Sequence, residues 1–166
     1  MEKSSSKRAY AVCTAAAMVL FAVQMLYIHA NLEYAGSWGQ TAAISALFAL
    51  AAGIMLCGFV KLKKPTAGEL GLTCSIVCVT ALARVSMLDY VSSDYQSFLV
   101  GWLDVFRTGG FKTLGENVGD YNLIYQYVLL LISKAPLKDL YLVKLFTVLF
   151  DYGLALTMMQ ATGYFA

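Results

Sequence analysis

Residues 41–60 read TAAISALFALAAGIMLCGFV, a run without a single charged side chain. A helix that crosses a membrane needs about 20 predominantly apolar residues, and Thr41–Val60 supplies them. The alanines and glycines of the run suit close packing between helices in a bilayer. The basic segment Lys61-Leu-Lys-Lys-Pro65 follows and ends the run. This stretch predicts a transmembrane helix.

Comparable apolar runs lie on both sides of this stretch, and together they predict an all-α fold. The expected architecture is a polytopic membrane helix bundle of about five spans that forms one transmembrane domain. The expected spans cover residues 9–29, 41–60, 70–88, 121–134 and 140–160. The fourth run is short for a full span, at about 20 Å.

The composition supports a membrane protein and excludes several other classes. The chain has 166 residues, of which 60% are hydrophobic and 13% charged, whereas a soluble domain is about a quarter charged. The apolar excess must therefore face lipid or other helices. The net charge of +2 is too small for a polyanion binder, so no nucleic-acid partner is expected. All four cysteines lie in apolar runs, which implies no disulfide framework.

The basic residues predict how the spans are oriented. They gather near Lys3, at Lys61–Lys64 and at Lys134–Lys138, which are alternate ends of the five expected spans. The positive-inside rule places these segments and the N-terminus in the cytoplasm. Residues 89–120 then form an outer loop, and the C-terminus also lies outside.

The outer loop contains a predicted amphipathic helix. At about 30 residues, the loop is long for a simple connection. Ser93 and Gln96 have the spacing of a capping box, and Thr108-Gly-Gly110 ends the pattern. Between them an apolar stripe recurs at helical spacing, which is typical of a juxtamembrane helix lying on the membrane. The stripe comprises Tyr95, Phe98, Leu99, Trp102 and Phe106. A lid that seals the bundle is the alternative interpretation.

Three motifs in this half of the chain carry a family resemblance. Residues 93–106 read SDYQSFLVGWLDVF, in which Asp94 opens the helix and Trp102 follows eight residues later. Next come Gly119-Asp-Tyr-Asn-Leu-Ile-Tyr125 and Lys144-Leu-Phe-Thr-Val-Leu-Phe-Asp151. In this order the motifs resemble the GT-C class of membrane glycosyltransferases, which use polyprenyl-phosphate sugars as donors. Within that class they are similar to bacterial mannosyltransferase-like proteins related to the GPI-anchor mannosyltransferases.

The resemblance implies an activity and a set of site residues. It implies transfer of a hexose, mannose by analogy, from a polyprenyl phosphate to an acceptor on the outer face of a bacterial plasma membrane. Asp94 is the implied general base, because a carboxylate can take the acceptor proton. Asp120 would assist the base, bind the acceptor, or hold a divalent cation together with Asp94. The further candidate substrate-binding residues are Arg84, Trp102, Tyr121 and Tyr125.

Charged residues within the expected spans leave alternatives open. Arg84 either snorkels and pairs with Asp89 or contacts the phosphate of the lipid donor. Lys144 and Asp151 are seven residues apart and share one helix face. They form either a polar contact within the bundle or a contact to substrate.

The length of the chain gives a second functional hypothesis. Members of the family are several hundred residues long, so this chain is expected to be an N-terminal part that is inactive without a C-terminal half. The alternative is a non-catalytic small integral membrane protein, or a truncated relic, with a structural role. A transporter is disfavoured, because the sequence contains no inverted repeat.

Overall fold

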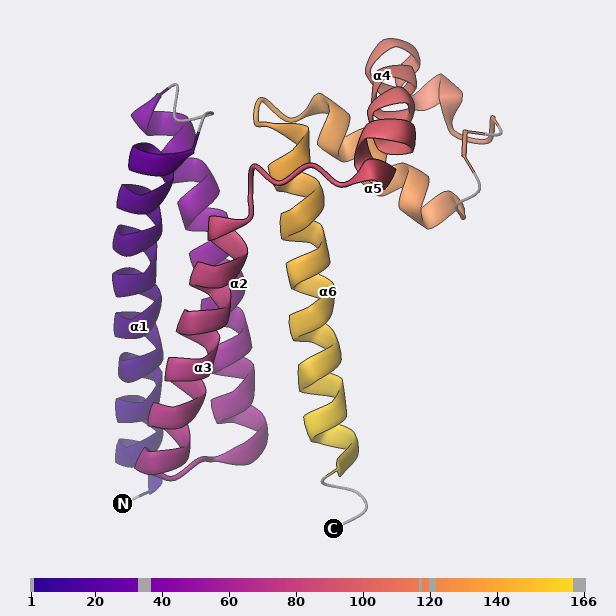
Figure 1. The fold of residues 1–166 in the computed structure, drawn as a ribbon. Coiled ribbons are helices and arrows are strands. Elements are labelled where there is room, and N and C mark those ends of the chain that lie inside the picture. Colours follow the sequence, from indigo (N-terminus) through magenta and orange to yellow (C-terminus); the bar gives the residue numbers. More distant parts are fainter. Residues whose placement is uncertain (1, 33–36, 117, 120–121, 163–166) are drawn as a thin grey trace. The chain divides into compact units, whose positions relative to one another are not determined.

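The computed structural model describes residues 2–32, 37–116, 118–119 and 122–162. Every regular element within these residues is a helix (Figure 1). Four of the helices are long and apolar enough to cross a membrane. The predicted all-α membrane bundle is confirmed, and the protein is a multi-pass membrane protein.

The four long helices coincide with four of the predicted runs. They are α1 (Glu2–Asn31), α2 (Trp38–Lys63), α3 (Ala67–Ser86) and α6 (Asp139–Thr162). Local signals set several of their ends. The side chain of Ser37 accepts a hydrogen bond from the Gln40 N–H at 3.2 Å and begins α2, as expected for an N-cap residue.

The turn between α2 and α3 is fixed by backbone and capping bonds. Lys64 adopts a left-handed conformation with φ 46°, and its N–H donates to the Val60 carbonyl oxygen at 3.1 Å. Thr66 and Glu69 then form a reciprocal capping box at the start of α3. The basic segment that ended the apolar run in the sequence therefore becomes a tight reversal between two spans.

The remaining apolar run, predicted as a span at residues 121–134, forms a shorter helix. This helix, α5 (Leu123–Lys134), has 12 residues and is about 18 Å long. The Asn122 side chain caps its start by accepting from the Tyr125 N–H at 3.1 Å. Its end at Lys134 is followed by extended Ala135. The structure thus differs from the five-span expectation, because α5 is shorter than a crossing helix needs.

The chain divides into two compact units rather than the one domain expected. Unit 1 comprises Met1–Leu88 and Leu145–Ala166, and unit 2 comprises Asp89–Lys144. Helix α6 contributes its first turns to unit 2 and the rest of its length to unit 1. We describe each unit by itself.

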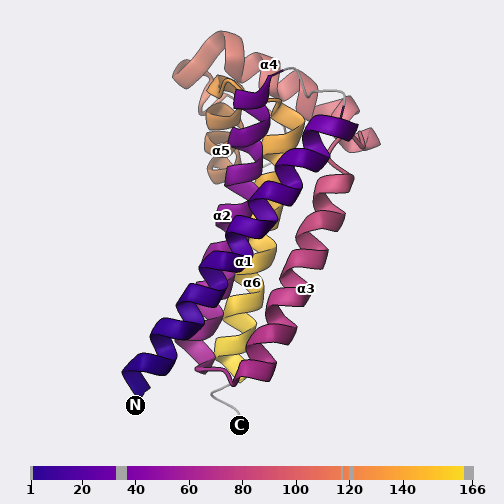
Figure 2. The ribbon, with the colours of Figure 1, turned by 90° about the vertical axis from the view of Figure 1, so that its left-hand side faces the viewer.

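Unit 1 is a bundle in which small residues allow helices to approach closely. Helices α1, α2 and α3 run alongside one another in both views (Figures 1 and 2). A Cβ atom added to Gly53 of α2 would lie 3.4 Å from the Cβ of Ala17 in α1. A Cβ on Gly58 would lie 2.9 Å from a methyl group of Leu156 in α6. Close packing of this kind stabilises contacts between membrane helices. The hydrophobic effect contributes little there, because lipid tails are as apolar as the side chains.

The start of α1 and the end of α6 lie at the same end of unit 1. Ala9 of α1 and Met159 of α6 pack against one apolar cluster, which also contains Val60 and Leu70. This differs from the expected placement of the two ends on opposite sides of the membrane. That expectation required α5 to be a fifth crossing, and α5 is too short for one.

Unit 2 is a pair of packed helices joined to the first turns of α6. It contains a π-helical turn η1 (Tyr95–Leu99), α4 (Val100–Gly109), a 3-10 turn η2 (Gly110–Thr113) and α5. An apolar core lies between α4 and α5. Its buried members in these helices are Leu99, Leu103, Phe106, Leu129, Leu130 and Ile132.

The predicted amphipathic helix exists, with two differences in register. Ser92, rather than Ser93, caps the start, since its Oγ accepts from the Tyr95 N–H at 3.2 Å. In the π-helical turn, the Val100 N–H bonds back five residues to the Tyr95 carbonyl oxygen. This wider turn shifts the phase of the stripe, so Leu103 is buried while Phe98 is 53% exposed. The four other residues of the predicted stripe, Tyr95, Leu99, Trp102 and Phe106, belong to the core or pack against it.

Candidate functional site

Asp94 lies at the start of the helical segment of unit 2, as the sequence predicted. It immediately precedes the π-helical turn, and its side chain makes no capping hydrogen bond. The residue is exposed. Within the described part of the chain no side chain pairs with its carboxylate. Turns of the π type occur often at functional sites, and here one directly follows an unpaired acid.

Most other described carboxylates of unit 2 are bound to a partner. Asp89 accepts from the Lys138 ammonium at 2.9 Å and from the Tyr141 hydroxyl. Asp104 and Asp139 both accept from Arg107. Glu116 is the second exposed acid for which the described residues supply no side-chain partner. Asp94 and Glu116 are therefore the two described carboxylates of unit 2 that no described side chain binds.

Arg107 joins α4 to the beginning of α6. Its guanidinium is 2.6 Å from Asp104 and also binds Asp139, 32 residues further along the chain. The bond with Asp139 raises the pKa of Arg107 above its ordinary value. The pKa of Tyr95 is also raised, first by burial and then by the negative charge of Asp139. Both groups therefore stay protonated at neutral pH.

Trp102 lies against the loop that leads to the second predicted acid. A Cβ atom on Gly119 would fall 2.6 Å from the indole ring, and the φ of Gly119 is +70°. The backbone just before position 120 thus lies close to α4, two turns after Asp94. Asp120 and Tyr121 themselves lie outside the described residues.

The structure gives Tyr125 and Arg84 packing and pairing roles. Tyr125 is half-buried and packs against the core between α4 and α5. Arg84 belongs to unit 1, where its Nη2 lies 2.5 Å from Oδ2 of Asp151. The described partner of Arg84 is thus Asp151, which the sequence did not suggest, and Asp89 binds Lys138 and Tyr141.

The polar contact expected between Lys144 and Asp151 is also replaced by two separate contacts. The Lys144 ammonium donates to the Tyr90 carbonyl oxygen at 2.5 Å, while Asp151 binds Arg84. Of the candidate site residues, Asp94, Trp102 and Tyr125 belong to unit 2, where Trp102 and Tyr125 pack against the same core. Arg84 is described in unit 1.

The described residues contain no group of three or more His, Cys, Asp or Glu side chains that could hold a metal ion. Of the two acids predicted as cation ligands, only Asp94 is described. It could contribute carboxylate oxygens to a hard cation, and further ligands would have to come from the substrate or from other segments.

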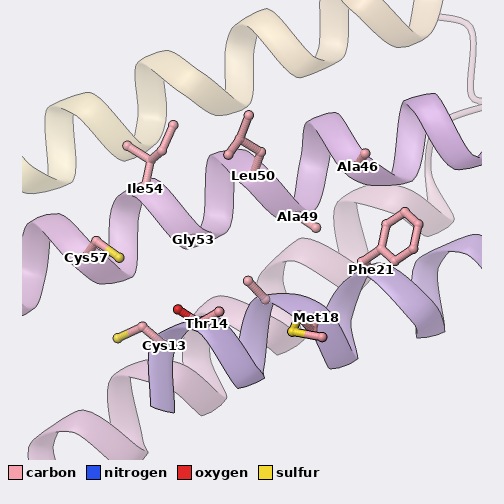
Figure 3. A pocket seen from close by; sticks show the side chains of 11 residues that line it. Cys13, Thr14, Met18, Phe21, Ala46, Ala49, Leu50, Gly53, Ile54 and Cys57 are labelled. Carbon is pink, nitrogen blue, oxygen red and sulfur yellow. The ribbon is translucent and has the colours of Figure 1, made fainter. Parts of the chain in front are cut away.

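A groove of about 540 Å³ between α1 and α2 is a separate feature of unit 1 (Figure 3). Figure 3 shows α1 and α2 as its walls, with apolar side chains such as Phe21, Leu50 and Ile54 around it. Thr14 is the one lining residue with a polar side chain, and its hydroxyl donates to the Tyr10 carbonyl oxygen at 3.0 Å. Two free cysteines, Cys13 and Cys57, also line the groove.

Sequence reasoning missed the contacts that hold the first turns of α6 in unit 2. Lys138 and Tyr141 reach Asp89 across 49 and 52 residues of chain. Only the spacing of Lys138 and Tyr141, three residues apart, could have suggested a shared partner, and it does not identify Asp89.

The chain matches no model of a known protein family, no curated protein and no solved structure.

Proposed function

We propose that this chain is a GT-C-type glycosyltransferase, or the N-terminal part of one, that transfers a hexose from a polyprenyl phosphate to an acceptor hydroxyl. Mannose is the sugar that the resemblance favours. One observation carries the proposal. Asp94, the acid that the resemblance selects, is exposed and unpaired at the start of a helix whose neighbouring carboxylates are bound to partners.

In this reaction the acceptor oxygen attacks the anomeric carbon of the donor sugar, and the bond from that carbon to the phosphate oxygen breaks. The acceptor proton passes to the Asp94 carboxylate. The polyprenyl phosphate leaves with the bonding electron pair. A carboxylate that no described side chain binds is free to accept a hydrogen bond from the acceptor hydroxyl.

The loop beside Trp102 supports a role for Asp120. Gly119, the described residue before it in the sequence, lies against the indole ring of Trp102. In the proposal Asp120 assists the base, binds the acceptor or shares a divalent cation with Asp94. In the proposal Tyr121 and Tyr125 are substrate-binding residues, as the resemblance implies.

We place the protein in a bacterial plasma membrane with its N-terminus in the cytoplasm. Four crossings then put the basic segment of Lys61, Lys63 and Lys64 in the cytoplasm as well, as the positive-inside rule predicts. They put Lys134 and Lys138 outside, contrary to the orientation expected from the sequence, because α5 is too short to be a crossing. Unit 2 follows the third crossing and lies on the outer face, where the resemblance places the acceptor.

The test compares two exposed acids of unit 2. Membranes containing the full-length protein are incubated with a labelled polyprenyl-phosphate mannose, and transfer to endogenous acceptors is measured. Asp94→Asn is expected to abolish transfer, whereas Glu116→Gln, an equally conservative change, is expected to keep it. Transfer by Asp94→Asn at the wild-type rate would show that Asp94 is not the base.

A non-catalytic membrane protein is the second candidate. Two ion pairs favour this second candidate. Asp151 binds Arg84, a candidate substrate-binding residue, and Lys138 binds Asp89, so these charges stabilise the fold. The second candidate predicts that wild-type membranes transfer no sugar above those lacking the protein.

A further inference from the structure

Helix α5 presents an apolar face that nothing in the described part of the chain covers. Four of its side chains recur on one face of the helix and are about half to three-quarters exposed. They are Leu123 (52%), Ile124 (75%), Tyr127 (47%) and Leu131 (69%). The opposite face, with Leu129 and Leu130, is buried against α4. Exposed apolar patches of this kind mark an interaction site.

The first turns of α6 belong to unit 2 and pack within it. Helix α6 is itself long and apolar enough to cross the bilayer, and it begins at Asp139. Leu142 and Val143, in its first two turns, pack against the core between α4 and α5. Lys138 binds Asp89, and Lys144 binds the Tyr90 carbonyl oxygen. Unit 2 is therefore built onto the end of a crossing helix.

Charged residues are found on α4 but not on the exposed face of α5. The exposed residues of the α4 segment are mixed: Asp104, Arg107 and Thr108 lie beside partly exposed Phe98, Val100 and Val105, while Leu103 and Phe106 are buried in the core. None of the four exposed side chains of α5 is charged. Lys134 lies at the very end of α5, and its ammonium donates to the Arg107 carbonyl oxygen at 2.8 Å.

We propose that α5 is an interfacial membrane helix, with Leu123, Ile124, Tyr127 and Leu131 embedded at the boundary between lipid headgroups and acyl chains. Helix α4 lies on the water side of α5. A tyrosine suits this depth, because its ring is apolar and its hydroxyl reaches water. A helix that is too short to span the bilayer but apolar along one face is most stable when it lies in this interface. The inference is independent of any glycosyltransferase activity.

Site-directed spin labelling in vesicles tests the proposal. Single cysteines are placed on the exposed face of α5 as Ile124→Cys and Leu131→Cys, in a background whose four native cysteines are replaced by alanine. Ser97→Cys and Gly101→Cys are matched controls on the exposed face of the α4 segment, and a Cβ at Gly101 meets nothing within 4 Å. The protein is reconstituted in phosphatidylcholine and phosphatidylglycerol vesicles. Collision of each nitroxide with oxygen and with a water-soluble nickel chelate is measured.

The α5 labels are expected to collide severalfold more with oxygen than with the nickel chelate, relative to the α4 labels. Equal ratios at all four positions would overturn the proposal, since α5 would then lie no deeper in the membrane than α4. Labels on α5 that are immobilised and shielded from both reagents would also overturn it, because another protein would then cover the face. Two positions on each helix keep the comparison valid if one variant fails to fold.

Discussion

Arg84 in α3 and Asp151 in α6 form an ion pair across 67 residues of chain, with 2.5 Å between Nη2 and Oδ2. Each charge lies in a segment that can cross the membrane. A charged side chain there is disfavoured unless it is paired or reaches water. The pair therefore fixes the side of α6 that faces α3 within unit 1.

Removing one partner of this pair should lower the free energy of unfolding more than removing both partners. Asp151→Asn leaves Arg84 unpaired and is expected to lower the free energy of unfolding by about 2 kcal/mol. The double variant Arg84→Gln, Asp151→Asn leaves no uncompensated charge and should lose less. Denaturant titration in detergent micelles measures both. A loss in the double variant equal to the sum of the two single losses would contradict an interaction between these side chains.

Gly119 and Gly101 provide a matched pair of glycines in unit 2. Gly119→Ala should destabilise unit 2 by about 1–3 kcal/mol, because φ +70° is strained for alanine and the methyl group would meet the Trp102 ring. Gly101→Ala should instead stabilise its helix by up to about 1 kcal/mol. Hydrogen exchange of α4 amides measures both effects. Equal exchange in the two variants would show that Gly119 does not lie against Trp102.

Arg107 should contribute more to the stability of unit 2 than Asp104 does, because it also binds Asp139, far away in the sequence. Arg107→Ala leaves Asp139, whose side chain is only 18% exposed, without its cation, and a loss of about 1–3 kcal/mol is expected. Asp104 is 65% exposed, so Asp104→Ala should cost less than about 1 kcal/mol. Limited proteolysis between α4 and α6 reports the difference. If Asp104→Ala is the more damaging change, the bond from Arg107 to Asp139 does not stabilise the unit.

Residues on both sides of α5 should be accessible from one face of the membrane. Lys112→Cys precedes α5, and Pro136→Cys follows it. A membrane-impermeant thiol reagent should modify both from the same side, since α5 is too short to cross. Lys63→Cys, in the turn between α2 and α3, should react from the opposite side. Reaction of Pro136→Cys together with Lys63→Cys would restore α5 as a fifth crossing.

Unit 2 should lose stability at alkaline pH through Tyr95. Its folded pKa is raised above the ordinary value of 10.0, so above that pH the unfolded chain releases a proton that the folded chain keeps. The unfolded state then binds fewer protons, and the free energy of unfolding falls as pH rises. Below pH 10 the contribution is fully present. Tyr95→Phe should flatten this part of the profile, measured by hydrogen exchange of α4, and an unchanged slope would exclude Tyr95 as its source.

The sequence by itself determined the class of the fold and most of its helices. Uncharged runs long enough for a bilayer, such as Thr41–Val60, have few alternatives, because a membrane span must satisfy its backbone hydrogen bonds within the helix. The outer-loop helix and its end at Gly110 were also predictable, since caps and periodicity act over a few residues. Asp94 at the start of that helix followed from the same local signals.

Tertiary structure decided the partners and the exposed faces. Periodicity marks an apolar stripe but not what covers it. Leu103 and Phe106 are buried in the core between α4 and α5, whereas Ile124 and Leu131 of α5 stay exposed. The π-helical turn at Tyr95–Leu99 shifted the register of the apolar stripe. No residue type in the sequence predicts such a turn. The choice of Asp151 for Arg84, and of Lys138 for Asp89, depends on segments far apart in the chain, because an ion pair requires only proximity in space.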